Sequence, residues 1–233
     1  MKMNVSLIEC LVLLGVVGVC WAIFGGSGAA NAAEHLPKPK TDLPTPKAGE
    51  VRTAVFAGGC FWCTEGVVRQ FKGVTDVKSG YAGGTKETAD YKTVCSGKTA
   101  HAEAIKITYD PSVITYAQLL QVFFLGHDPT TVDRQGHDAG HQYRSAIFYE
   151  NDDQKKVAKE YIDLLNESKT FNGNVVTTLE PIKADEFYAA EDYHQDYVTL
   201  NPSQPYIRAC ALPKMEKVRK EFKDWLKTDK DSK

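Results

Sequence analysis

The chain has few cysteines, no cluster of basic residues and no internal repeat. It has 233 residues and a formal net charge of −2, so nucleic acid is not expected as a partner. Of its six cysteines, Cys10 and Cys20 lie in an apolar leader, and the other four are too few for a disulfide framework. The composition, 42% hydrophobic and 25% charged, is that of an ordinary globular domain.

The first 32 residues predict a secretory signal peptide. Lys2 forms a short positive region, residues 11–24 are apolar, and small residues with Ala30 and Ala32 in an A-x-A arrangement follow. An uncleaved membrane anchor is the alternative, because the apolar stretch is nearly long enough to span a bilayer. We therefore expect an exported protein, periplasmic or extracellular, that contacts a membrane only if this segment is retained.

A proline-rich segment separates the leader from the folded domain. Within residues 33–50, the stretch "HLPKPKTDLPTPKAGE" contains four prolines and few apolar residues, which predicts an extended linker. We expect the folded domain to span residues 51–228, followed by a charged tail at 229–233.

The hydrophobic pattern of the domain predicts a two-layer α+β fold. Strands and helices are expected in the order β-α-β-β-α-β, at residues 51–57, 60–71, 73–84, 101–111, 115–126 and 143–150. This order is typical of the ferredoxin-like split βαβ core. A further helix is expected at residues 152–168, a strand at 175–182, and a short helix with a loop at 191–202. A C-terminal extension follows, whose helix starts at Pro213.

The stretch "GGCFWC" (58–63) places Cys60 where a strand gives way to a helix. A helix N-terminus favours a thiolate, which is both a nucleophile and the form of cysteine that oxidises. A thiol–disulfide oxidoreductase that uses Cys60 and Cys63 is an alternative function. A zinc module that adds His137 and His141 is a further alternative, although two bulky aromatics inside the C-x-x-C are unusual for it.

Glu103 is the one acid on an otherwise apolar strand face. Period-2 alternation places it beside Ile105, Ile107 and Tyr109. Burial there would raise the pKa of the carboxyl and keep it protonated as a proton donor. The alternative is an acid at a strand end that reaches solvent.

Three tyrosines, Tyr91, Tyr143 and Tyr206, lie in loops that the fold could bring together. Each is either a buried hydrogen-bond donor or an amphipathic residue at the rim of a site.

Five ordered motifs closely resemble the A class of peptide methionine sulfoxide reductases. They are "GGCFWC", "YKTVCSGKTAHAEAIKITYDPSVITYAQLL", "HDPT", "RQGHDAGHQYRSAIFY" and "AEDYHQDYVTLNP", and the similarity runs from about Val51 to Pro205. The resemblance implies repair of oxidised proteins, by reduction of peptide-bound and free methionine (S)-sulfoxide through a cysteine sulfenic acid and a redox-active disulfide. It implies no metal or cofactor, but an external dithiol reductant such as thioredoxin.

The resemblance also assigns roles to residues. Cys60 corresponds to the cysteine that attacks the sulfoxide sulfur, and Glu103 to the acid that protonates its oxygen. Tyr91 and Tyr143 correspond to hydroxyls that hold the oxygen, and Asp138 to a carboxylate that organises the site. Phe61 and Trp62 correspond to an aromatic wall around the methyl group, and Tyr206 to one further tyrosine.

The C-terminal segment departs from this resemblance. Many members end in a glycine-rich tail with "GYC", whose cysteine resolves the sulfenic acid, whereas here "NPSQPYIRACALPKMEK" (201–217) runs into a helix. Cys63 lies within one helical turn of Cys60, so we predict Cys63 as the resolving cysteine, with Cys210 as the alternative. Cys95 is a third candidate that the sequence does not place.

Overall fold

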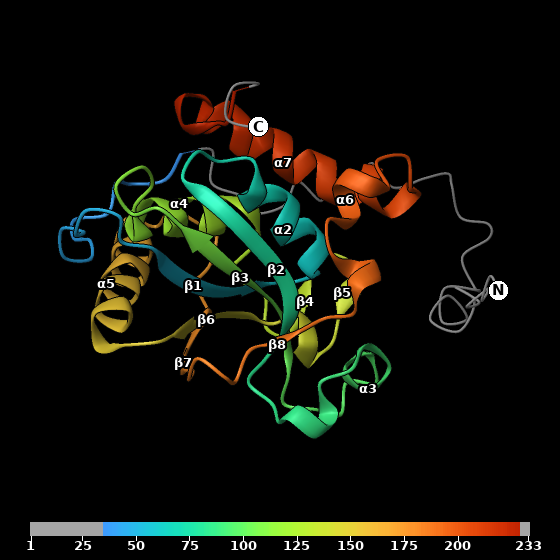
Figure 1. The fold of residues 1–233 in the computed structure, drawn as a ribbon. Coiled ribbons are helices and arrows are strands. Elements are labelled where there is room, and N and C mark those ends of the chain that lie inside the picture. The colour runs from blue at the N-terminus through green and yellow to red at the C-terminus, as the bar shows by residue number, and fades with distance from the viewer. Residues whose placement is uncertain (1–34, 229–233) are drawn as a thin grey trace.

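A six-stranded sheet forms the centre of the computed structural model, which describes residues 35–228 (Figure 1). In spatial order its strands are β7 (Thr178–Pro181), β6 (Ser145–Tyr149), β1 (Arg52–Gly58), β3 (Ala102–Tyr109), β2 (Val74–Ala82) and β8 (Tyr188–Ala189). Neighbouring strands are antiparallel except for β6 and β7. The predicted signal peptide and charged tail lie outside the described residues.

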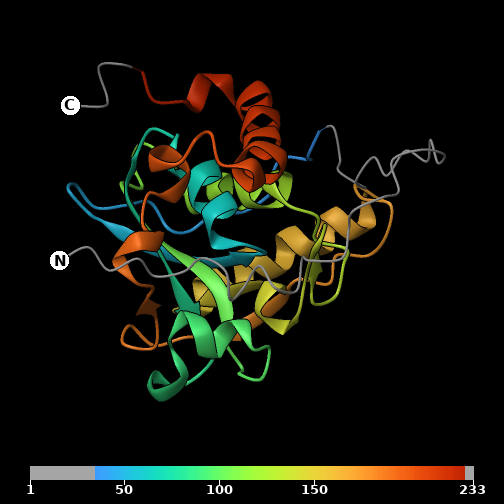
Figure 2. The ribbon, with the colours of Figure 1, turned by 90° about the vertical axis from the view of Figure 1, so that its right-hand side faces the viewer.

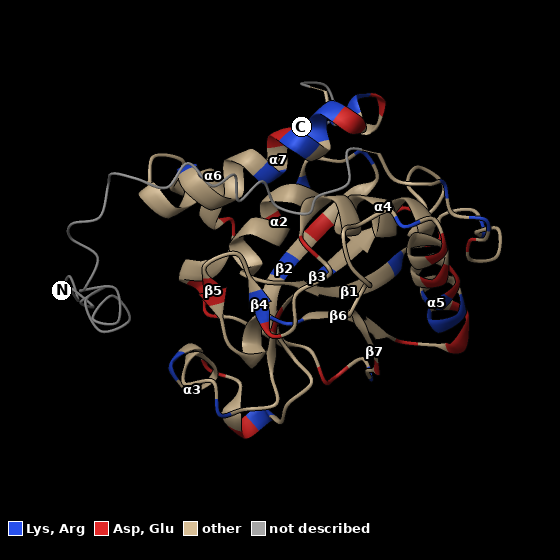
Figure 3. Cartoon of the chain, turned by 180° about the vertical axis from the view of Figure 1, so that it is seen from behind, with Lys and Arg blue, Asp and Glu red and all other residues tan. Residues whose placement is uncertain are grey.

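Helices cover one face of the sheet. They are α2 (Phe61–Arg69), α4 (Tyr116–Gly126), α5 (Asp152–Glu167) and α7 (Leu212–Glu221), with the short α3 (Tyr91–Cys95) and α6 (Tyr197–Leu200) nearer the end of the sheet. Helix α2 packs on β2, β3 and β1, helix α4 packs on β1, and α7 packs against both helices (Figures 1 and 2). Charged side chains gather on α5 and α7, whose outer sides meet solvent (Figure 3).

The opposite face of the sheet has a smaller core made of short side chains. Val55, Ala57 and Ala104 are buried there, and Ile182 and Phe187 of the segment after β7 cover them. The predicted combination of a sheet with packed helices is therefore confirmed. Strands β7 and β8 extend the sheet at its two edges, and the parallel pair β6–β7 makes it a mixed sheet.

Local sequence signals explain where the helices begin. Thr115 and Gln118 form a capping box at the start of α4, and the Asn151 side chain accepts the N–H of Gln154 at α5. Pro213 lies in the first turn of α7, where its missing N–H costs nothing. Helix α2 ends where the Lys227 ammonium donates to the carbonyl of Arg69 at 3.0 Å.

Residues 35–50 form no helix or strand, but they are packed onto the domain. Leu36 and Leu43 lie against the main core, and the Tyr161 hydroxyl donates to the carbonyl of Pro37 at 3.0 Å. The Asp42 carboxylate accepts the N–H of Ala117 in the first turn of α4 at 3.1 Å. The extended conformation agrees with the proline content, and the two leucines and the hydrogen bonds place the segment in contact with the domain.

Within residues 35–228, none of the helices is both long enough and apolar enough to cross a membrane.

Candidate active site

The turn between β1 and α2 has a backbone that only glycine fits. Gly59 has φ +91°, and a Cβ built on it would lie 2.5 Å from the Cβ of Gln135. Cys60 follows as the N-cap of α2, and its side chain makes no capping hydrogen bond. The thiol is thus held at the helix start, with only 6% of the residue exposed.

The Cys60 thiol is uncharged in this environment. Burial raises its pKa well above the usual value, and contact with the Cys63 thiol raises it further. The raised pKa disagrees with the sequence-based expectation of a thiolate, and burial is the main cause.

Cys63 lies one turn along α2, and the Cys60 thiol donates a hydrogen bond to it, which lowers the Cys63 pKa. The Cys63 sulfur is 3.9 Å from the Tyr206 hydroxyl, and that hydroxyl donates to Asp138 Oδ2 at 2.5 Å. Asp138 lies on β5 (Asp138–Ala139), which pairs with β4 (Arg134–Gln135) in a short hairpin. The hairpin thus connects Asp138 through Tyr206 to the two thiols.

Glu103 points into the helix side of the sheet, on the same face as Ile105 and Ile107, and is 2% exposed. Its Oε2 accepts the N–H of Phe61, the first residue of α2, at 3.0 Å. Burial raises the pKa of this carboxyl well above 4.5, nearby Cys60 raises it further, and the Phe61 N–H only partly opposes them. The side chain is therefore a neutral acid beside the thiol.

Tyr143 ends the short helix η3 (His141–Tyr143) and lies near the same acid. Its pKa is raised by burial first, and then by Glu103, Cys95 and Cys60, which lie within electrostatic reach. The hydroxyl therefore stays protonated and can act as a hydrogen-bond donor.

An aromatic cluster covers the start of α2. The Trp62 ring stacks on Tyr197 with centroids 3.8 Å apart and an 8° angle, and meets the edge of Tyr206 at 6.1 Å. Trp62 Nε1 donates to His194 Nδ1 at 3.1 Å. Phe61 is 1% exposed and lies beneath, 5.0 Å from the His194 ring.

Tyr91 joins this cluster through His194, with ring centroids 4.4 Å apart. The Glu191 carboxylate accepts the Tyr91 N–H at 3.0 Å and the Tyr81 hydroxyl at 2.9 Å. Burial lowers the pKa of His194 to about 4, so the ring is neutral and its proton lies on Nε2, because Nδ1 accepts from Trp62.

Three residues of this cluster were not predicted: Glu191, His194 and Tyr197. They lie in the stretch "AEDYHQDYVTLNP", where no regular hydrophobic period exists to show which side chains are buried. The two tyrosines and the histidine in "DYHQDY" are the sequence feature that could have indicated an aromatic cluster.

The cysteines and histidines of the zinc hypothesis do not come together. His141 Nδ1 lies 3.0 Å from Asp133 Oδ1, and His137 is exposed. In the part of the chain from 35 to 228, no group of three or more His, Cys, Asp or Glu side chains has a metal-binding arrangement.

The other two thiols, Cys95 and Cys210, lie on different elements. Cys210 is half-buried on the π-helix η5 (Ile207–Ala211), where burial raises its pKa and Asp138 and Cys60 are within electrostatic reach. Cys95 ends α3, near Tyr143. Within residues 35–228, Cys60, Cys63 and Cys210 form no disulfide.

A buried thiol beside a second thiol, a neutral acid and tyrosine hydroxyls defines a thiol-dependent oxidoreductase. A family model described as "Peptide methionine sulfoxide reductase" matches residues 52–226. The chain belongs to this family, and the reaction it catalyses is the reduction of methionine sulfoxide. The alternative of a C-x-x-C disulfide oxidoreductase is not favoured.

Curated relatives and solved structures agree with this assignment. The chain is 49% identical over 195 residues to "Peptide methionine sulfoxide reductase MsrA 2" of Synechocystis sp., covering 82% of this chain and 90% of the relative. It is 44% identical to MsrA of Deinococcus radiodurans over 207 residues, 89% of this chain and 99% of the relative. Reduced Mxr1 from Saccharomyces cerevisiae superposes with a TM-score of 0.60 at 38% identity, covering 71% and 92% of the two chains. Methionine sulfoxide reductase A of Corynebacterium diphtheriae superposes with a TM-score of 0.56 at 30% identity, covering 74% of this chain and 89% of that chain.

Proposed function

We propose that this chain reduces the S epimer of methionine sulfoxide, peptide-bound or free, with Cys60 as nucleophile and Glu103 as proton donor. The observation that carries the proposal is the 3.0 Å hydrogen bond from Phe61 N–H to Glu103, which holds a buried neutral acid beside Cys60. The carboxyl oxygen not used in that bond carries the proton.

The chemistry follows from these groups. The Cys60 sulfur attacks the sulfoxide sulfur while the sulfoxide oxygen gains negative charge. Glu103 gives that oxygen a proton, and Tyr143 and Tyr91 donate hydrogen bonds to it. The oxygen ends on Cys60 as a sulfenic acid, and the methionine leaves as the thioether.

Substrate recognition depends on the aromatic cluster. The methyl group of the sulfoxide has no polar handle, so the faces of Phe61 and Trp62 must select it by shape. Exchange of the methyl and the oxygen would turn the polar atom toward Trp62. The wall therefore distinguishes the two epimers, and family membership favours S.

Recycling begins at Cys63. Its sulfur attacks the Cys60 sulfenic acid, a disulfide forms and the oxygen leaves as water. The hydrogen bond between the thiols and the lowered pKa of Cys63 support this role. A thioredoxin-like dithiol reduces the disulfide, and neither a metal nor an organic cofactor takes part.

The decisive test of the function is turnover of peptide methionine (S)-sulfoxide and (R)-sulfoxide with a dithiol reductant. We expect product from the S epimer, and none from either epimer in Cys60→Ser, because a hydroxyl is a poor nucleophile toward sulfur. Cys95→Ser is the matched control and should retain turnover. Turnover by Cys60→Ser would refute the assignment.

The recycling route is tested separately by peptide mapping. After one turnover without reductant, free thiols are alkylated and disulfide-linked peptides are identified by mass spectrometry. We expect a Cys60–Cys63 linkage. A Cys60–Cys210 linkage would assign the resolving role to the C-terminal segment instead.

Two broader features belong to the same proposal. The strand order β6–β1–β3–β2, with α2 between β1 and β2 and α4 between β3 and β6, supports a ferredoxin-like split βαβ core. The leader supports export to the periplasm or the exterior, where the substrates would be oxidised exported proteins. N-terminal sequencing of protein from cell fractions tests this, and retained residues 1–32 would indicate the membrane-anchored alternative.

A further inference from the structure

Residues 190–197 carry two of the residues that contact the Trp62 ring, yet they include no strand or long helix. His194 accepts the indole N–H of Trp62, and Tyr197 stacks on its face. The geometry of the wall therefore depends on what holds this segment against the sheet.

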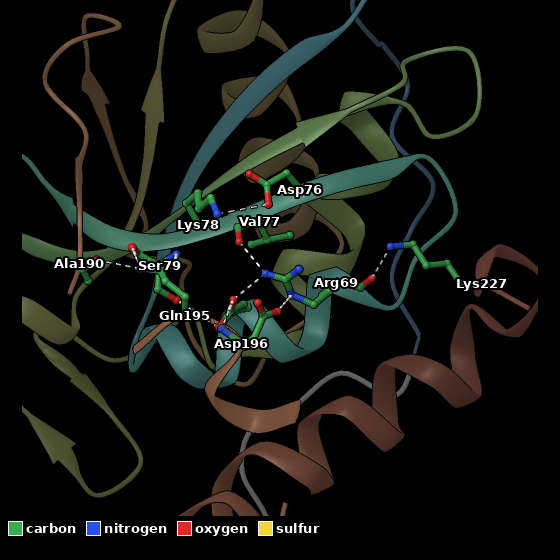
Figure 4. Close-up of polar contacts among 10 residues, drawn as sticks. Arg69, Asp76, Val77, Lys78, Ser79, Ala190, Gln195, Asp196 and Lys227 are labelled. Atoms are coloured by element: carbon green, nitrogen blue, oxygen red, sulfur yellow. Dashed lines mark hydrogen bonds and ion pairs between the residues drawn. The ribbon is translucent and has the colours of Figure 1, made fainter. Parts of the chain in front are cut away.

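Gln195 attaches the segment to strand β2. Its Oε1 accepts the backbone N–H of Ser79 at 3.0 Å, and its Nε2 donates to the Ser79 carbonyl at 3.0 Å. The same Nε2 also donates to the carbonyl of Ala190 at 2.9 Å (Figure 4). The amide thus pairs with Ser79 as a neighbouring strand would, and links it to Ala190.

The next residue is fixed by a buried acid. Asp196 has φ +54°, a conformation that costs a non-glycine residue about 1–2 kcal/mol and persists only where neighbours enforce it. Its N–H donates to the Glu65 carboxylate at 3.0 Å. Its own carboxylate pairs with Arg69 Nε at 2.9 Å (Figure 4). Glu65 is 1% exposed and also accepts from Arg69 Nη2 at 2.8 Å.

We propose that Gln195 is a positioning residue for substrate binding, because it holds His194 and Tyr197 against Trp62. The inference rests on the role proposed above for Trp62 as the wall that receives the methyl group. Gln195 flanks His194 directly and Tyr197 at two residues, so loss of its amide removes the side-chain attachment to Ser79 that supports both rings against Trp62. No hydrogen bond described for Gln195 involves Cys60, Cys63 or Glu103.

Gln154 provides a matched control. It is 3% exposed, its Oε1 accepts the N–H of Glu150 at 2.9 Å, and its Nε2 donates to the carbonyl of Thr53 at 2.9 Å. It therefore holds backbone groups in the same way as Gln195, but on α5, remote from the aromatic cluster.

The test is steady-state kinetics of the full chain with a peptide methionine (S)-sulfoxide and dithiothreitol. We expect Gln195→Ala to raise KM about tenfold or more while kcat changes little, since a misplaced wall weakens binding without altering the thiol. Gln154→Ala should lose stability but keep its KM. The rate of Cys60 alkylation by iodoacetamide, followed by mass spectrometry, should be the same in all three proteins.

Gln195→Met retains side-chain length and decides the question if Gln195→Ala does not fold. An unchanged KM in the folded Gln195 variants, or a KM change equal to that of Gln154→Ala, would overturn this inference but leave the proposed role of Trp62 in place. Trp62→Ala is measured in parallel. An unchanged KM in Trp62→Ala would overturn the wall role itself, and with it this inference.

Discussion

At the scale of single residues, the site combines two acids that both remain protonated. The Cys60 thiol and the Glu103 carboxyl are both buried, which raises the pKa of each, and the nearby Cys60 raises the pKa of Glu103 further. The proposed mechanism uses this state, because the attacking sulfur and the proton for the departing oxygen are then both present before substrate binds.

We expect Glu103→Gln to lower kcat by about 10²–10⁴-fold, the usual cost of losing a general acid. The wild-type rate should fall as pH rises through the raised pKa of Glu103, and the variant should lack that decline. Rate measurements between about pH 5 and pH 9 test both statements. A variant rate within a few fold of wild type would mean that a tyrosine or water supplies the proton.

Glu103→Gln should raise the stability of the fold, although it lowers kcat. The folded state retains the Glu103 proton, whereas the unfolded chain releases it near the ordinary pKa of 4.5, so wild-type stability falls as pH rises above that value. We expect Glu103→Gln to melt at a higher temperature than wild type at pH 8, with the difference shrinking toward pH 4. An equal difference at both pH values would contradict a raised pKa.

At the scale of elements, the β1–α2 turn and the β4–β5 hairpin fit against each other. The Gln135 side chain accepts the N–H of Asp128 at 3.1 Å and donates to its carbonyl at 3.0 Å, and it fills the space beside Gly59. The hairpin that carries Asp138 is therefore packed directly onto the residue before Cys60.

Gly59→Ala should displace Gln135, lower kcat at least tenfold and reduce the free energy of unfolding by about 1–3 kcal/mol. Gly49→Ala is the control, since Gly49 also has positive φ, +71°, but has no atom within 4 Å of an added Cβ. Denaturant unfolding and steady-state rates measure both effects. Equal effects of the two substitutions would show that backbone strain at positive φ, and not displacement of Gln135, causes the loss.

The elements predicted from sequence are those with a strong period. The alternation of residues 101–111 predicts both β3 and the inward direction of Glu103, and the hydrophobic pattern of residues 115–126 predicts α4. The hairpin β4–β5 has two residues in each strand, too few to show any period. The Trp62–Tyr197 stack depends on packing between segments 135 positions apart, which no local pattern records.

At the scale of the whole molecule, the segment before β1 is joined to three helices. Besides its contacts with Ala117 and Tyr161, the His35 ring lies 2.9 Å from the Glu221 carboxylate on α7. These contacts lie on the helical layer and involve none of the residues around Cys60, so we expect them to affect stability and not turnover.

Asp42→Ala removes the acceptor for the Ala117 N–H at the start of α4. We expect the free energy of unfolding to fall by about 0.5–2 kcal/mol, as for the loss of a helix cap, with kcat/KM within about twofold of wild type. Chemical denaturation followed by tryptophan fluorescence measures the first, and the sulfoxide assay measures the second. Unaltered stability would mean that residues 35–50 lie on the domain without supporting it.

The protonated thiol and carboxylic acid also determine how the first half-reaction relates to the surrounding water. In the proposed mechanism, the sulfoxide oxygen takes the proton of Glu103, and the carboxylate so formed takes the proton of Cys60. The products are a sulfenic acid, a thioether and the original neutral acid. No ion enters or leaves the pocket during these transfers. A bound peptide that seals the site from bulk solvent therefore does not interrupt the reduction, and only the later departure of the oxygen as water requires an exit.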